Sequence, residues 1–244
     1  MVGQTGPMGK KLVGALLVVV VLVGAGVYWF VVRDDAPEEL SLDSGSEGSG
    51  EPVGDAPDTY DGEWVVRTGG DTTAGFRIEE EFAGAISHTA VGRSPEVDGS
   101  LTVDGSEVTA ADVVVDLTAL EFTDDPPTGN VGNRAGAMED NGLETSEFPE
   151  ATFTLTEPLD LGGDPADGFT ATVDAVGELT LHGVATPVTV PLEAQVEGDT
   201  IRVATVEPVP VVLADHDIEV RSPPFVASID DQGSFELLLV FEKA

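Results

Sequence analysis

Apolar and polar side chains alternate along most of the chain after residue 58, and the alternation is clearest from Ala171 to Val196. Residues 171–182 place an apolar or glycine residue at every second position, and residues 188–196 repeat this pattern. A period of two is typical of a half-buried antiparallel strand. Gly183 and Pro187 interrupt the alternation, so we predict two long strands joined by a turn within His182–Pro187.

Shorter runs of the same kind predict further strands before and after this pair. They are Trp64–Val66, Ala74–Phe82, Ala85–Arg93, Val97–Val103, Val108–Leu120, Ala151–Leu155, Ile201–Leu213 and Ser234–Glu242. Strands at this spacing, with no amphipathic helix between them, indicate a sandwich or a barrel. Asp124–Glu147 lacks the pattern, and we expect a loop there with at most a short helix near Asn133–Glu139.

The N-terminal region has a different pattern. Leu12–Val32 is a run of 21 residues without charge, which is long enough for a helix to cross a bilayer. We predict a single-pass membrane anchor at 12–32 with residues 1–11 in the cytoplasm, because Lys10 and Lys11 precede the run and basic residues favour the cytoplasmic side. The domain after it would be extracytoplasmic. The alternative is a cleaved signal peptide, whose apolar core is usually shorter.

Residues 33–58 are rich in Asp, Glu, Gly, Ser and Pro and hold few apolar side chains. Such a segment buries too little surface to offset the entropy of ordering it. We therefore predict a flexible acidic linker at 33–58 and a β domain at 59–244.

Charge and cysteine content exclude several function classes. The chain has 46 acidic and 10 basic residues, a net charge of −36, which would repel nucleic acid. It has no cysteine, so disulfides, thiol nucleophiles and Cys-ligated metals are excluded. We interpret the acidity as a solvated surface of a kind suited to high salt, with a cationic partner as the alternative.

The segment Gly177–Val188 resembles the G-x-L-T-[apolar]-x-G-V-x-x-P-V signature of the YceI-like family. Val115–Leu120, Asn133-Arg134 and Phe148–Phe153 are similar to further segments of that family, so the resemblance covers roughly 60–244. It implies an antiparallel lipocalin-like β-barrel with a short helical insert, whose interior holds a polyisoprenoid or a related apolar chain. The chain departs from the family pattern where Phe76-Arg77-Ile78 runs into three glutamates.

The resemblance also implies which strand faces line the interior. Alternation then gives a set of candidate ligand-binding residues: Trp64, Phe76, Ile78, Val113, Val115, Leu117, Phe153, Leu155, Leu179, Leu181, Val190 and Leu192. The implied function is a membrane-tethered carrier of an apolar isoprenoid-type lipid, with no cofactor apart from a bound isoprenoid lipid or quinone. The alternative is a ligand-free barrel that acts as an interaction module for a membrane redox or cell-envelope complex.

Catalysis has little support in the sequence. There is no G-x-S-x-G nucleophile motif and no phosphate-binding loop. His88, His182 and His216 lie far apart in sequence, and we interpret them as surface or turn residues rather than catalytic or metal-binding groups. We therefore predict a non-enzyme without a metal site, and an enzyme that uses His216 is the weakest alternative.

Overall fold

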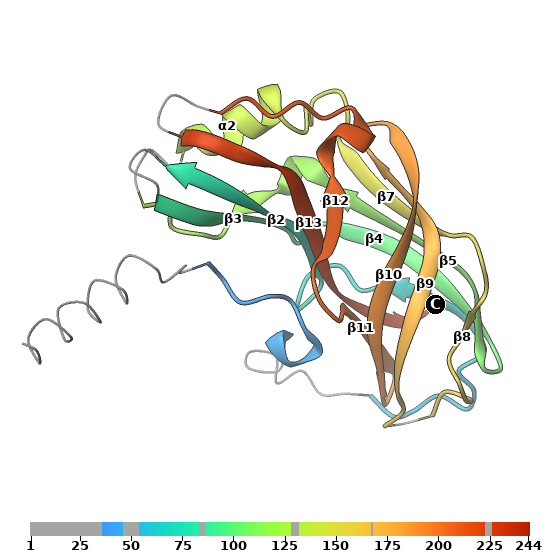
Figure 1. Ribbon diagram of the computed structural model, residues 1–244. Coiled ribbons are helices and arrows are strands. Elements are labelled where there is room, and N and C mark those ends of the chain that lie inside the picture. The colour runs from blue at the N-terminus through green and yellow to red at the C-terminus, as the bar shows by residue number, and fades with distance from the viewer. Residues whose placement is uncertain (1–35, 46–53, 83–85, 128–131, 167, 223–225) are drawn as a thin grey trace, which may run out of the picture. The chain divides into compact units, whose positions relative to one another are not determined.

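The computed structural model describes residues 36–45, 54–82, 86–127, 132–166, 168–222 and 226–244 (Figure 1). Ala36–Ala244 form one compact unit. The predicted anchor at 12–32 lies outside the described residues. Within the described part of the chain, no helix has the length and apolar character needed to cross a bilayer.

Eight antiparallel strands form a closed ring, which confirms the predicted all-β barrel. In ring order they are β1 (Gly62–Val66), β4 (Val97–Asp104), β5 (Glu107–Asp116), β7 (Glu150–Leu155), β9 (Thr170–Leu181), β10 (Val184–Glu197), β11 (Thr200–Thr205) and β13 (Val226–Lys243). Pairing of Trp64 with Lys243 and of Val66 with Phe241 joins β1 to β13 and closes the ring. A closed barrel leaves no unpaired strand edge along the ring.

Five further strands extend the barrel wall. The last residues of β13 pair with β1 and β11, whereas its first residues pair with β2 (Thr73–Phe82) and β12 (Val209–Val212). The strands β3 (Ile86–Ser94) and β6 (Glu121–Phe122) continue the sheet from β2, and β8 (Leu159–Asp160) pairs with β5. Pro208 lies between β11 and β12. Proline has no backbone N–H to donate to a neighbouring strand, so it favours an interruption of the pairing there.

The hairpin of β9 and β10 confirms the predicted strand pair, but its turn is shorter than expected. His182 and Gly183 both have positive φ, at 52° and 74°, as a two-residue type I′ turn requires. Pro187 therefore lies within β10, where it is opposite Glu178. Figure 1 shows the two strands as long neighbouring ribbons.

Helical segments are few among the described residues. The insert between β6 and β7 contains the helix α2 (Gly132–Asn141), close to the short helix expected near Asn133–Glu139. Three short 3₁₀ turns complete the secondary structure: η1 (Leu42–Gly45), η2 (Leu117–Ala119) and η3 (Leu213–His216). Figure 1 shows α2 beside the barrel end formed by β2, β3 and the start of β13.

Residues 36–45, here called the N-terminal strap, pack against the outer face of the barrel. Leu40 is 6% exposed and contacts Ala204 of β11 and Leu238 of β13. Its backbone N–H donates to Glu236 Oε2 at 3.1 Å, and Arg93 joins Glu236 to the Glu38 carbonyl. The prediction of a flexible linker is therefore wrong for 36–45, because one leucine and one buried carboxylate hold this segment on the wall.

Replacing Leu40 with Ala should lower the free energy of unfolding of the compact unit by about 2 kcal/mol. This is the low end of the usual loss for a buried leucine, because only one side of the strap packs against the barrel. Urea unfolding of residues 36–244 measures this loss. Glu39→Ala is the matched control, since the Glu39 side chain is exposed. Equal stability of the two variants would show that the strap contributes nothing to the fold.

Candidate functional site

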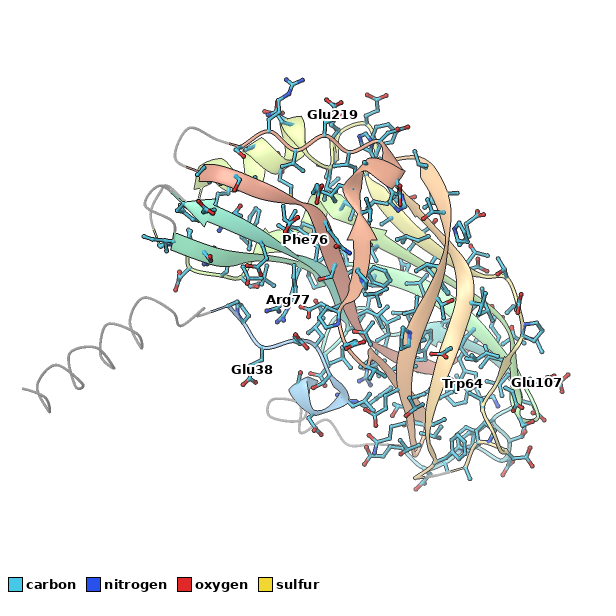
Figure 2. The ribbon with its side chains drawn as sticks, viewed as in Figure 1. Glu38, Trp64, Phe76, Arg77, Glu107 and Glu219 are labelled. Atoms are coloured by element: carbon cyan, nitrogen blue, oxygen red, sulfur yellow. The ribbon has the colours of Figure 1, made fainter. Side chains whose placement is uncertain are left out.

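The interior of the barrel contains a cavity of about 320 Å³. Its lining is almost entirely apolar and comes from inward-facing residues of most strands together with α2. Ligand pockets in proteins usually occupy about 300–1,000 Å³, so the space is large enough to be a binding site. Figure 2 shows the side chains on these strands and labels Phe76, which belongs to β2.

Eleven of the twelve residues predicted from alternation border this cavity. They are Phe76, Ile78, Val113, Val115, Leu117, Phe153, Leu155, Leu179, Leu181, Val190 and Leu192. Leu117 does so from η2 rather than from a strand. That these residues contact a ligand stays a prediction.

Trp64 differs from the other eleven because it does not border the cavity. It is fully buried in the core, its ring stacks on Tyr60 with the centroids 5.8 Å apart, and its indole N–H donates to the Tyr60 carbonyl at 2.8 Å. Val103 and Phe241 belong to the same buried cluster. Placing Trp64 in the cavity wall was therefore wrong: its indole is buried against Tyr60, while Val103 and Phe241 of the same cluster border the cavity.

Two glycines help to keep the interior open. A Cβ at Gly177 would lie 2.4 Å from the Phe153 ring, and a Cβ at Gly92 would lie 2.4 Å from the Phe76 ring. Each ring thus occupies the position that a side chain on the neighbouring strand would take. The two aromatic rings lie along the wall instead of across the interior, which leaves space for a ligand.

The cavity opens at the α2 end of the barrel. Among its described lining residues, the exposed ones are Asn141 at the end of α2 and Val220 and Arg221 in the segment after η3. The other described lining residues are buried or half-buried. From this end the apolar lining continues into the interior of the barrel.

Beside this opening, a buried polar cluster joins α2 to the barrel wall. Arg134 of α2 donates from Nη1 to Asp124 Oδ2 at 2.6 Å and from Nη2 to Glu80 Oε2 at 3.2 Å. Asp124 Oδ2 is 2.6 Å from His88 Nε2, and Asp124 Oδ1 accepts the Val91 N–H at 2.9 Å. Glu80 and Arg134 border the cavity itself.

Burial affects the two carboxylates of this cluster differently. Burial alone would raise the pKa of Asp124, but hydrogen bonds from His88, Val91 and Arg134 outweigh it and lower the pKa to about 2. Burial raises the pKa of Glu80 above its usual value, and the opposing attraction of Arg134 is too weak to cancel this. Asp124 is therefore the firmly ionised partner of Arg134.

An aromatic contact fixes the plane of the Arg134 guanidinium. Its central carbon lies 4.3 Å from the centre of the Phe122 ring, and Phe122 packs edge-on against Phe76, which borders the cavity. A cation above an aromatic face is attracted to the ring quadrupole. The guanidinium is thus held by two carboxylates and one ring, and this positions it at the cavity wall.

This cluster was not predicted from the sequence, although part of it follows from strand alternation. Glu80 lies two residues after Ile78 and four after Phe76, so the same face of β2 carries all three. His88 likewise shares a face with Ala90, which borders the cavity. The contact of Arg134 with Asp124 joins the helix to a loop, and no periodic pattern predicts it.

The interpretation of the three histidines as surface or turn residues was wrong with respect to burial. His88 is 6% exposed and His216 is 2% exposed. His182 does lie in a turn, but its Nε2 is 2.9 Å from Glu144 Oε2 and its ring packs on Phe148. These contacts attach the loop after α2 to the β9–β10 turn. In the described residues no three His, Cys, Asp or Glu side chains gather as a metal site.

Comparison with known proteins gives a consistent result. Residues 64–241 match the family model described as the YceI-like domain. The fold resembles the structure of a polyisoprenoid binding domain from Saccharophagus degradans implicated in plant cell wall breakdown, with a TM-score of 0.56 and 20% identity over 74% of this chain and 98% of that one. A UPF0312 protein of Vibrio vulnificus (strain YJ016) is 34% identical over 104 residues, which are 42% of this chain. The match spans about half (48%) of that relative.

Asp124→Asn should remove about 2 kcal/mol of stability at pH 7, the equivalent of its lowered pKa. A carboxyl whose pKa is lowered by folding stabilises the protein above its unfolded pKa, near 4, and loses this effect as the pH falls to about 2. The difference between wild type and variant should therefore shrink between pH 4 and pH 2 in urea unfolding of residues 36–244. Asp125→Asn, at an exposed position, serves as the control. A difference that does not change with pH would contradict the assignment.

Proposed function

Because the chain belongs to the YceI-like domain family, we propose that its barrel is a non-catalytic carrier that holds an apolar isoprenoid-type lipid, a polyisoprenoid or a quinone. The observation that supports this most is the apolar cavity of about 320 Å³ inside a closed barrel. The related domain from Saccharophagus degradans is named as polyisoprenoid binding, which suggests the same ligand class here.

The energetics of such binding fit a site without a distinctive sequence motif. Burial of one CH₂ group contributes about 0.8 kcal/mol, so a five-carbon isoprene unit contributes roughly 4 kcal/mol before the cost of association. Two or three buried units therefore suffice for affinity on the order of micromolar. An apolar interior provides this affinity without requiring a particular residue at any one position.

Purification of residues 36–244 without detergent, followed by solvent extraction and mass spectrometry, tests the proposal directly. This fragment includes the strap as well as the barrel. We expect an isoprenoid lipid to be released in near-stoichiometric amount. A well-folded protein that yields no lipid would favour the alternative, a ligand-free interaction module.

Leu155→Glu and Leu181→Glu should each abolish lipid retention, because a carboxylate in the apolar interior costs several kcal/mol. Both side chains border the cavity. Thr189→Glu adds the same charge at an exposed position of β10 and should retain lipid. Extraction and mass spectrometry measure the bound lipid, and melting curves check that each variant is folded. Unchanged loading in both leucine variants would contradict the cavity assignment.

Membrane tethering on the extracytoplasmic side is the second part of the proposal. The uncharged run Leu12–Val32 supports it, with Lys10 and Lys11 on its N-terminal side. Five residues, 33–37, separate this run from Glu38, whose carbonyl Arg93 binds in the strap. A carrier attached in this way would stay close to the lipid that it collects or delivers.

Single cysteines introduced into this cysteine-free chain test the topology. Glu107→Cys, at an exposed position of β5, should react with a membrane-impermeant maleimide in intact cells. Gln4→Cys should react only after the membrane is permeabilised. Figure 2 labels Glu107 at the barrel end away from α2. Labelling of both sites in intact cells, or of neither, would contradict the proposed orientation.

A further inference from the structure

The polar cluster beside the cavity opening bears on which isoprenoid the barrel accepts. An apolar interior alone would accept the chain of any isoprenoid, whatever group ends it. Arg134 and Glu80, however, form a charged part of the lining at the end where the cavity opens. We propose that this cluster selects isoprenoids that end in an uncharged oxygen group, an alcohol or a quinone carbonyl, over those that end in phosphate. This inference rests on the lipid-carrier function proposed above.

The guanidinium of Arg134 is already engaged. Its two terminal nitrogens donate to Asp124 and to Glu80, and the Phe122 ring covers one of its faces. A phosphate recognised by arginine usually takes two parallel hydrogen bonds from the guanidinium. Both terminal nitrogens of Arg134 already donate to a carboxylate, so a phosphate here would compete with Asp124 and Glu80 for the guanidinium. A hydroxyl or carbonyl oxygen needs only one donor or acceptor and leaves both ion pairs in place.

The charge of the cluster also disfavours an anion. One guanidinium is in contact with two carboxylates, and the side chains of Arg134, Glu80 and Asp124 are 5%, 8% and 0% exposed. The burial that raises the pKa of Glu80 shows that the site already tolerates its second negative charge poorly. A buried phosphate would add negative charge without a new counter-ion, which costs several kcal/mol. An uncharged head group avoids this cost.

The position of the cluster suits a terminal head group. The opening lies at the α2 end, and away from it the lining consists mainly of buried or half-buried apolar residues, several of them from the cluster around Trp64. A ligand with its chain in the interior would therefore place its other end near Arg134 and Glu80. There a hydroxyl can donate to Glu80, or a carbonyl can accept from Arg134.

One exposed cation also borders the opening and offers a competing arrangement. Arg221 lies in the segment after η3, which also carries the exposed acids Asp217 and Glu219. A phosphate that stayed in solvent beside Arg221 would avoid the buried cluster. Such an exposed pair contributes little, about 0–1 kcal/mol in most proteins, so we expect the buried cluster to dominate.

Farnesol and farnesyl phosphate, which share one isoprenoid chain, provide the test. The full chain in detergent micelles is incubated with equal concentrations of both, and native mass spectrometry counts the molecules of each that remain bound. We expect farnesol to be bound at least about tenfold more often, a ratio equivalent to about 1.4 kcal/mol. Equal occupancy, or an excess of farnesyl phosphate, would overturn the inference and point to Arg221.

Variants separate the effect of the cluster from a general preference for the less polar probe. Glu80→Gln keeps the shape of the side chain and removes its charge, so it should raise the share of farnesyl phosphate about tenfold. Glu81→Gln removes the same charge at an exposed position of β2 and should leave the ratio unchanged. An identical ratio in both variants would overturn the role of the cluster.

The same experiment distinguishes this inference from the proposed function. If the wild type binds both probes without preference, the barrel carries isoprenoids but the cluster does not select among them. If the folded wild type binds neither probe, the carrier function fails and the inference fails with it. Farnesol binding that exceeds farnesyl phosphate binding, with the ratio shifted only by Glu80→Gln, supports both.

Discussion

The structure depends on the strand β13, which pairs with β1 and β2 on one side and with β11 and β12 on the other. Its last residues join β1 to β11 and close the barrel, while its first residues join β2 and β12 and lengthen the wall. A sheet that did not close would expose its inner face to water, and the cavity would be only a groove. Closure makes the alternating apolar residues of distant strands into one enclosed lining.

Because the barrel is closed, small details of its lining decide what the interior can do. Gly92 and Gly177 let two phenylalanine rings lie along the wall, so the interior is not filled by its own aromatic side chains. The cluster of Arg134, Asp124 and Glu80 places buried charge near the open end, whereas the lining farther inside is mainly apolar. An isoprenoid in this barrel would thus meet apolar side chains along its chain and polar groups at one end.

Alternation predicted the barrel strands, because the direction of a side chain in a strand depends only on its place in the sequence. Together with the inward face that the family resemblance implied, it also gave eleven of the cavity-lining residues. The same rule places Glu80 on the inner face, but a run of three glutamates gave no reason to separate the inward one from its exposed neighbours. Trp64 follows the alternation too, yet its indole packs on Tyr60 rather than beside the cavity. The docking of Leu40 on Ala204 and Leu238 was also missed, since composition alone describes the strap as linker.

The sequence by itself determined which segments form strands, which of their faces are apolar and that the surface is strongly acidic. These properties are local: they depend on residue type and on neighbours one or two positions away. Only the tertiary structure decided that an open cavity remains inside, that Arg134 reaches Asp124 and Glu80, and that the strap binds Glu236. These depend on how segments distant in the sequence meet once β13 closes the barrel, and no local pattern carries that information.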